Sequence, residues 1–163
     1  MVAVIAHALA VIRRDVFGGT ADPNLVAAAA LYHDASEIFT GDLPSPIKYL
    51  NPEILAAYRQ VEDVAMDKLK RLLPEQLQGS YAPLLTDLDK DVLTLIKAAD
   101  RLSAYIKCLE ELRTGNDEFQ AARREILRSI QAEPLPETVY FMEHFIPAFD
   151  LTLDELDLGH ALT

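Results

Sequence analysis

The chain has 163 residues, half of them apolar, and it carries 26 acidic against 15 basic side chains for a net charge of −11. One domain of this size buries a sizeable core without a disulfide or a structural metal, so a metal bound here is expected to serve chemistry. The negative charge argues against a nucleic-acid groove or an anionic membrane surface as the main partner. A lone Cys108 excludes an intramolecular disulfide and fits a cytoplasmic location.

The first predicted element is a helix within the apolar run MVAVIAHALAVI. The run is too short to span a membrane, and Arg13 and Arg14 follow it, whereas the basic residues of a signal peptide precede the apolar core. No N-cap residue stands before the run, and the apolar pattern is already present at Val2. We therefore expect the middle of a buried helix, with the chain starting part-way through that element.

The rest of the chain is punctuated by helix start and stop signals. Asp22 followed by Pro23 predicts a helix that Gly41 closes. The later helices are expected from Asn51-Pro52 to about Leu73, a short one from Pro74, then from Asp89 to Gly115, from Asn116 or Asp117 to about Gln131, and from Pro136 to about Phe149, with a capping box at Thr152 and Glu155. Period-two alternation of the kind strands show is absent beyond a few residues. The sequence therefore predicts an all-α fold in one domain.

The segment LYHDASEIFTGDLPSP carries the first candidate chemistry. On a continuous helix, His33 and Glu37 are i and i+4, and Asp34 and Glu37 are i and i+3, so all three would share one side. An imidazole beside a carboxylate suits a divalent transition metal, and Glu37 is placed to hold or deprotonate a water on that metal. The His-Asp dipeptide alone is a weak signal, and a solvated helix end is the alternative interpretation.

A second feature is Asp100, in DVLTLIKAADRLSAYIKCLEEL. The apolar positions of this segment define a buried face made of Leu93, Ile96, Ala99, Leu102, Ile106 and Leu109. Asp100 borders or enters that face, where a carboxylate is costly unless a cation or hydrogen bonds satisfy it. An ion pair with Lys97 or Arg101 is one explanation. A metal shared with His33 and Asp34 explains both features at once.

With these residues in view, the chain resembles the bacterial 5'-deoxynucleotidases of the HD-domain phosphohydrolase superfamily. The resemblance rests on HDASEIFTGDLPSPIKY, IKAADRLSAYIKCLEEL, GNDEF and YFMEHFIPAF, and it extends from Val4 to about Glu155. It implies a single-domain HD-type helical bundle over residues 1–163, a homodimer, and a small-molecule nucleotide as substrate. The implied reaction is hydrolysis of a 5'-deoxynucleoside monophosphate to deoxynucleoside and phosphate.

The resemblance also assigns roles to residues. It implies that one divalent metal (Mn, Co, Zn, Mg, Fe and Ni are not distinguished) is bound by His33, Asp34 and Asp100. It makes Glu37 the water-orienting glutamate and places Asp42 near the scissile ester. Together with Asp42, Pro44 and Lys48 are the expected substrate-binding residues.

One departure from the family pattern limits this expectation. The first metal-binding histidine of the family would fall just upstream of Met1, so weak metal binding and low turnover are expected. His7 matches a non-ligand position, and we expect it to be packed. Tyr32, Phe39, Tyr49 and Tyr58 are interpreted as core or pocket-wall residues. Two other functions stay open: an HD hydrolase of another phosphorylated metabolite, and a non-catalytic protein that kept the fold.

Overall fold

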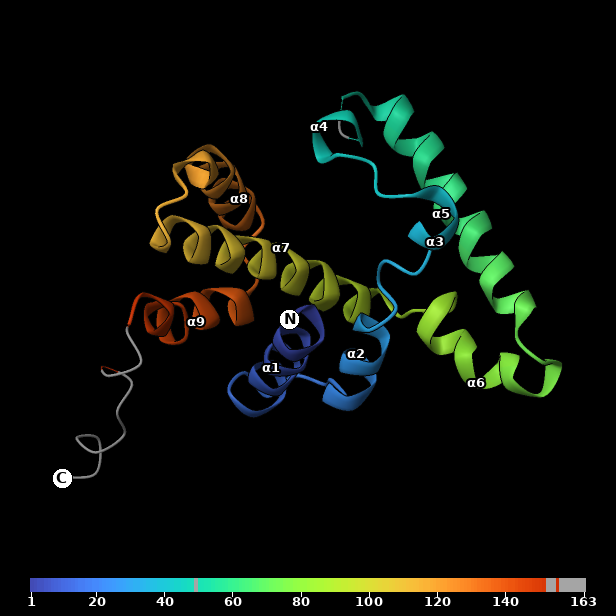
Figure 1. Ribbon diagram of the computed structural model, residues 1–163. Coiled ribbons are helices and arrows are strands. Elements are labelled where there is room, and N and C mark those ends of the chain that lie inside the picture. Colours follow the sequence, from blue (N-terminus) through green and yellow to red (C-terminus); the bar gives the residue numbers. More distant parts are fainter. Residues whose placement is uncertain (49, 152–154, 156–163) are drawn as a thin grey trace.

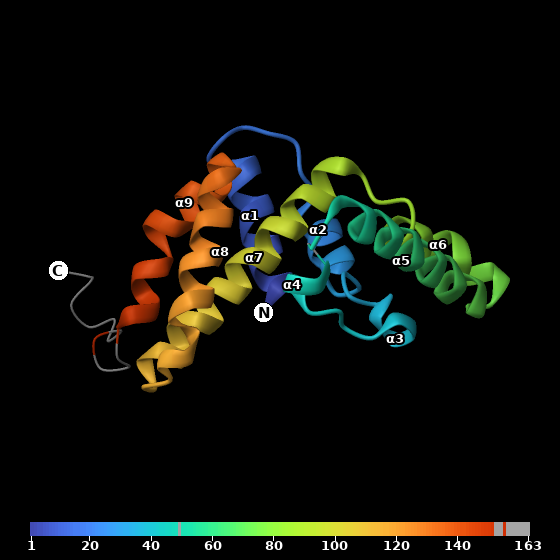
Figure 2. The same ribbon diagram turned by 90° about the horizontal axis from the view of Figure 1, so that it is seen from above.

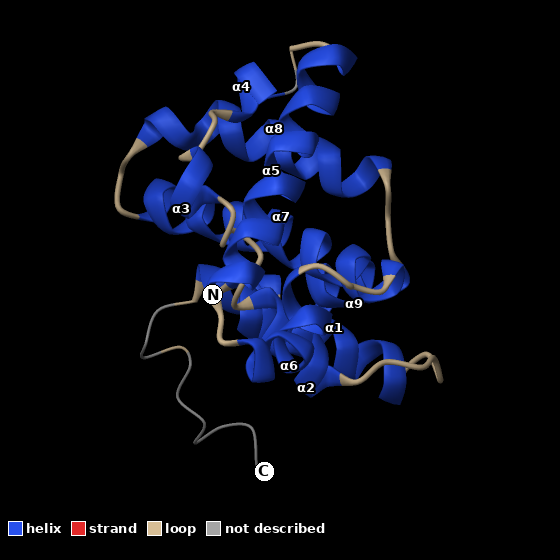
Figure 3. Cartoon of the chain, turned by 90° about the vertical axis from the view of Figure 1, so that its right-hand side faces the viewer, coloured by secondary structure: helices blue, strands red, loops and turns tan. Residues whose placement is uncertain are grey.

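The computed structural model describes residues 1–48, 50–151 and 155, and every regular element in that part of the chain is helical (Figure 3). The α-helices are α1 (Val2–Asp15), α2 (Pro23–Ala30), α3 (Glu37–Thr40), α4 (Ser45–Lys48), α5 (Pro52–Leu72), α6 (Glu75–Leu85), α7 (Lys90–Arg113), α8 (Gln120–Ala132) and α9 (Pro136–His144). Two 3₁₀ turns, η1 (Asp117–Phe119) and η2 (Ile146–Asp150), complete the set. The all-α prediction is confirmed for the described residues.

The longest helix, α7, forms the centre of the core (Figure 1). Helices α1 and α2 pack together, and both contact α7. The side chains buried between these helices include Leu9, Val26, Leu95, Leu102 and Ile106, all below 2% exposed. Helix α8 covers α7 on another side, while α9 packs on α1. The first predicted helix is therefore confirmed as a buried element.

A largely buried ion pair links α9 to α1. The Arg13 guanidinium donates from Nε to Oε1 of Glu137 over 2.6 Å, and the two side chains are only 15% and 5% exposed. The second carboxylate oxygen of Glu137, Oε2, is buried without a hydrogen-bond partner among the described residues. The contact between the two helices is thus partly electrostatic.

Helices α3 to α6 form a separate excursion, which we call the arm (residues 37–86). Figure 2 shows α5 and α6 extending away from α1, α8 and α9. Within the arm, α5 contacts α3, α4 and α6. Helix α6 joins the arm through α2 to the rest of the helices, α1, α2, α7, α8 and α9, which we call the body. Helix α5 is amphipathic, yet Ala65 is its one buried residue. The arm therefore depends less on deep burial than the body does.

Three predicted N-caps are confirmed. The Asp22 carboxylate accepts hydrogen bonds from Asn24 N (2.9 Å) and Leu25 N (3.3 Å) at the start of α2. The Asn51 side-chain oxygen accepts from the Ile54 N–H over 2.8 Å at the start of α5. At α7, the Asp89 carboxylate accepts from the Asp91 N–H over 2.7 Å. Each cap satisfies a backbone donor that lacks a partner within its helix.

Replacing Asn51 by Ala is expected to lower the free energy of unfolding of the arm by about 1 kcal/mol, because the Ile54 N–H loses its acceptor. Urea unfolding followed by circular dichroism measures the change. Asn51→Ser, which keeps a capping oxygen, serves as the control and should retain most of the stability. An equal loss in both variants would mean that the cap contributes nothing.

The predicted continuous helix from Asp22 to Gly41 is wrong. Helix α2 ends at Ala30, and residues 31–36 form successive turns before the four-residue α3. In this stretch the backbone bonds join residues three apart, from Tyr32 N to Ala29 O (3.0 Å) and from Ala35 N to Tyr32 O (3.0 Å). Tighter bonding of this kind ends the α-helical ladder. Gly41 nevertheless closes α3 as expected, with a φ of 67° that favours glycine.

The later helix boundaries agree with the predictions apart from short 3₁₀ turns. Helices α5 and α7 have nearly the expected limits, and α6 fills the short element predicted from Pro74. The helix predicted from Asn116 or Asp117 begins as η1 and continues as α8. The one predicted from Pro136 to Phe149 divides into α9 and η2. Thr152 and Tyr49 lie outside the described residues, so the predictions for them stay untested.

Candidate functional site

His33 and Asp34 lie in the turns between α2 and α3. The His33 ring nitrogen Nδ1 is 2.9 Å from the backbone carbonyl oxygen of Ala30. A carbonyl oxygen only accepts hydrogen bonds, so Nδ1 is the donor, and a neutral ring then presents the lone pair of Nε2. This is the arrangement by which proteins orient a metal-binding histidine through its other nitrogen. Because the helix ends at Ala30, the carbonyl oxygen of Ala30 accepts this hydrogen bond and orients the His33 ring.

The His33 Nε2 atom faces two carboxylates. It lies 2.8 Å from Oδ2 of Asp34 and 3.9 Å from Oδ1 of Asp100, which reaches the site from α7. A lone pair that faces carboxylate oxygens is repelled unless a proton or a cation lies between them. The structure thus brings together the three predicted metal ligands, although His33 and Asp34 do not lie on a helix.

Of the two predicted placements of Asp100, bordering or entering the buried face of α7, the structure does not show the second. Its side chain is 59% exposed, whereas Ile96, Ala99, Leu102, Ile106 and Leu109 of the predicted face are buried. Asp100 follows Ala99 around the helix and so lies on the open side. The proposed pairing with Arg101 is not observed either, because the Arg101 guanidinium contacts Glu133 at 3.4 Å. The aspartate remains directed at His33.

The donor set fits a divalent cation, although the ligands are not yet in a binding arrangement. Among the described residues, no group of three or more His, Cys, Asp or Glu side chains stands ready to hold a metal ion. Two ligands of one ion lie at most about 4.2 Å apart, twice a bond length of about 2.1 Å. Both distances from His33 Nε2, 2.8 and 3.9 Å, are within that limit. A cation could therefore lie between His33 and either of the two carboxylates.

The surrounding electrostatics favour a cation as well. Burial, followed by the charges of Asp34 and Asp42, raises the pKa of Glu37 above its ordinary value of 4.5. Loss of surrounding water raises the pKa of Asp100 above 3.8 despite its exposed surface, and the charge of Asp34 adds to this. His33 and Lys48 act in the opposite direction on both groups. Asp34 thus lies within electrostatic reach of both Glu37 and Asp100, and Asp42 lies within reach of Glu37.

Helix α4 and the loop before it supply the expected substrate-binding residues. Pro44 accepts hydrogen bonds from the Ile47 and Lys48 N–H groups through its carbonyl oxygen, at 2.8 and 3.0 Å. The Lys48 ammonium donates to Oε1 of Glu62 over 2.7 Å and lies 4.5 Å from the centre of the Tyr58 ring. Glu62 was not singled out in the sequence. Its i, i+4 spacing from Tyr58 was the available signal.

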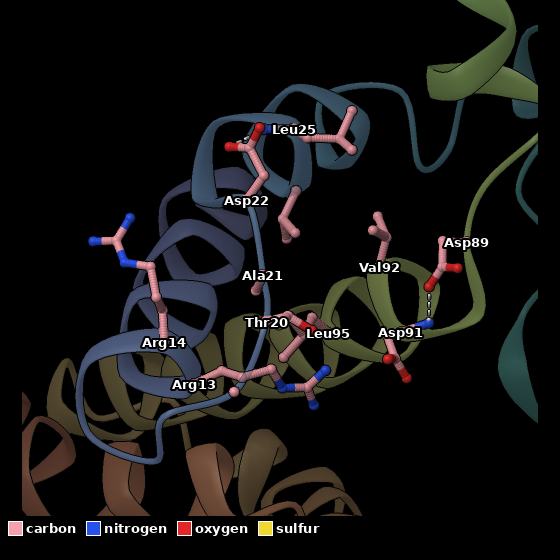
Figure 4. Close-up of a pocket in the computed structure, with 12 residues that line it drawn as sticks. Arg13, Arg14, Thr20, Ala21, Asp22, Leu25, Asp89, Asp91, Val92 and Leu95 are labelled. Atoms are coloured by element: carbon pink, nitrogen blue, oxygen red, sulfur yellow. Dashed lines mark hydrogen bonds between the residues drawn. The ribbon is translucent and has the colours of Figure 1, made fainter.

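A groove lies elsewhere, between α1, α2 and the start of α7 (Figure 4). Its volume is about 680 Å³, and none of the seven predicted site residues lines it. Three of its charged side chains serve the fold, since Asp22 and Asp89 are helix caps and Arg13 pairs with Glu137. His7 lies on a smaller apolar groove between α1 and α2 and is exposed, so the expectation of a packed side chain is wrong. Within the described residues, no helix is long and apolar enough to cross a membrane.

Comparison with known proteins gives a consistent result. The family model described as "5'-deoxynucleotidase YfbR-like" matches residues 1–149. The chain is 46% identical over 157 residues to a 5'-deoxynucleotidase of Photobacterium profundum, covering 95% of this chain and 81% of that protein. The identity to the 5'-deoxynucleotidase YfbR of Escherichia coli O1:K1 is also 46% over 157 residues, covering 95% and 79%. The crystal structure of an HD-domain phosphohydrolase from Listeria innocua is similar with a TM-score of 0.73 and 25% identity, covering 91% of this chain and 72% of that one.

Proposed function

This chain belongs to the YfbR-like 5'-deoxynucleotidase family, and from that premise we infer that it hydrolyses 5'-deoxynucleoside monophosphates to deoxynucleoside and phosphate. The observation that carries the assignment to this site is the convergence of His33, Asp34 and Asp100, from two segments far apart in the chain. An HD-fold protein without catalytic activity would not need the imidazole nitrogen to face both carboxylates.

We propose that His33, Asp34 and Asp100 hold one divalent cation. When bound, such a cation neutralises phosphoryl charge and makes water easier to deprotonate. The identity of the cation is open, because one nitrogen and two carboxylate oxygens accept Mn, Co, Zn, Mg, Fe and Ni.

Glu37 is the proposed general base. Its raised pKa brings the carboxylate closer to the proton affinity that a base needs near neutral pH. It would take a proton from the water that attacks phosphorus in line with the ester bond. Asp42, which interacts electrostatically with Glu37, would assist at the leaving ester oxygen.

The remaining groups are proposed to bind the nucleotide. The Lys48 ammonium would attract the phosphate, and Pro44, whose carbonyl oxygen anchors α4, would shape the wall beside it. We further propose a homodimer in the cytoplasm. Exposed apolar side chains such as Val61, Val64 and Leu72 on α5 favour self-association, and the buried thiol of Cys108 suits a reducing compartment.

The test is phosphate release from a panel of 5'-deoxynucleoside and 5'-ribonucleoside monophosphates, with Mn, Co, Zn or Mg added in turn. We expect release that needs metal, favours deoxynucleotides and disappears in Asp34→Ala. Release from other phosphate esters alone would identify a hydrolase of a different metabolite. No release above Asp34→Ala, from folded protein supplied with metal, would reject catalysis by this chain.

A further inference from the structure

Helix α5 contacts both ends of the segment that carries Asp42 and α4. We call this segment the substrate loop (residues 41–48). At one end, the Tyr58 hydroxyl donates to the carbonyl oxygen of Gly41 over 3.3 Å. At the other end, Glu62 Oε1 accepts from Lys48 Nζ over 2.7 Å. Tyr58 and Glu62 are one turn apart on α5, so they project from the same face.

The two residues at these contacts, Lys48 and Tyr58, also interact directly. The Lys48 ammonium lies 4.5 Å from the centre of the Tyr58 ring, within range of a cation–π interaction. The side chains of Lys48 and Glu62 are 25% and 28% exposed, so water only partly screens their ion pair. Three side chains on two helices therefore fix the position of one positive charge.

That charge lies at the end of α4 (Ser45–Lys48), which packs against α5. Helix α3, which begins with Glu37, packs against the same helix. A cation that is already held in place does not have to be ordered when an anionic substrate arrives, so less binding energy is lost. The same contacts also limit the freedom of the substrate loop, on which Asp42 follows Gly41.

We propose that Glu62 and Tyr58 are positioning residues for nucleotide binding. Glu62 holds the Lys48 ammonium where it meets the substrate phosphate, and Tyr58 holds Gly41 so that Asp42 is presented to the ester. Neither residue touches the reacting atoms, so their effect passes through Lys48 and the substrate loop. This proposal rests on the proposed function, but it makes α5 part of the active site.

The first experiment compares the kinetics of Glu62→Gln with those of the parent protein. Loss of the carboxylate removes the ion pair that helps to hold the Lys48 side chain, so KM for a 5'-deoxynucleotide is expected to rise about threefold to tenfold, with kcat within about twofold. Asp63→Asn is the matched control, because Asp63 is the exposed neighbour of Glu62 on α5, and it should leave both constants unchanged. A KM for Glu62→Gln equal to that of the parent would overturn the proposal.

A double-mutant cycle tests whether Glu62 acts through Lys48. Lys48→Met alone should raise KM at least as much as Glu62→Gln, and adding Glu62→Gln to Lys48→Met should change KM by less than about twofold. Independent, multiplicative effects of the two substitutions would show that Glu62 does not work by holding the ammonium.

A third measurement needs no activity and no metal. Amide hydrogen exchange of a peptide covering residues 41–50 should be faster in Glu62→Gln and Tyr58→Phe than in Asp63→Asn. Unchanged exchange in both variants would show that α5 does not restrain the substrate loop. If the parent protein releases no phosphate with any metal, the proposed function fails, and this exchange experiment still decides whether the restraint exists.

Discussion

Replacing Glu37 by Gln is expected to lower kcat by roughly 10²- to 10³-fold, because the amide is nearly the same size but cannot accept a proton. Glu37 is not among the three proposed metal ligands, so binding of a divalent metal should change little. Phosphate release under saturating nucleotide measures kcat, and calorimetric titration with Mn measures metal affinity. Asp34→Ala, in contrast, should weaken metal binding as well as activity.

The pH profile provides the control for this assignment. A base works only when deprotonated, so kcat of the parent protein should fall as the pH drops through the pKa of Glu37, which is raised above 4.5 by burial and by Asp34 and Asp42. In Glu37→Gln the residual activity should lack that dependence. A variant that keeps kcat within about threefold of the parent would show that proton removal lies elsewhere.

The second large effect concerns stability. Arg13→Ala is expected to lower the free energy of unfolding by about 3–5 kcal/mol, because Glu137 keeps a buried charge without its partner. The second carboxylate oxygen of Glu137, Oε2, does not offset this loss of stability, since it already lacks a hydrogen-bond partner among the described residues. Urea unfolding is followed by circular dichroism and by tyrosine fluorescence, since the chain has no tryptophan. The transition gives the urea midpoint and the denaturant dependence of the free energy of unfolding.

Two further variants separate the charge effect from the loss of side-chain packing. Arg14→Ala, one residue along, should be neutral, because Arg14 pairs with the adjacent Asp15 in solvent. Arg13→Met combined with Glu137→Met should recover most of the lost stability, since an apolar pair of similar volume carries no desolvation cost. A double variant as unstable as Arg13→Ala would indicate that packing, not the uncompensated charge, causes the loss.

Much of the fold could be predicted from local signals because the helix starts depend on local chemistry. Asp22, Asn51 and Asp89 all cap helices as expected, since each cap needs only a side-chain oxygen and the next few backbone N–H groups. The break at residues 31–36 gave no such signal. Ala-rich turns lead into it and no Gly or Pro lies inside, so the sequence favours a continuous helix. In the structure the bond between His33 Nδ1 and the Ala30 carbonyl oxygen, three residues apart, accompanies the break.

The candidate site was predicted more by resemblance than by spacing. Helical spacing placed His33, Asp34 and Glu37 on one side of a helix that the structure does not contain, yet the turns still bring His33 and Asp34 together. Periodicity placed Asp100 at the edge of the core, whereas it is exposed. The contact between Glu62 and Lys48 could not be predicted, because the two residues belong to different helices whose packing is a tertiary property.

The division of the molecule into a body and an arm has a consequence for how the active population is controlled. The arm contains Glu37, Asp42 and Lys48, whereas Asp100 lies in the body. The arm joins the body through the packing of α6 on α2. Proteins open locally where few apolar contacts are buried, at a free-energy cost below that of global unfolding. A molecule whose arm has opened in this way would keep its core, yet it would lack an assembled candidate site. The fraction of competent enzyme would then be set by this local equilibrium and not by the global free energy of unfolding.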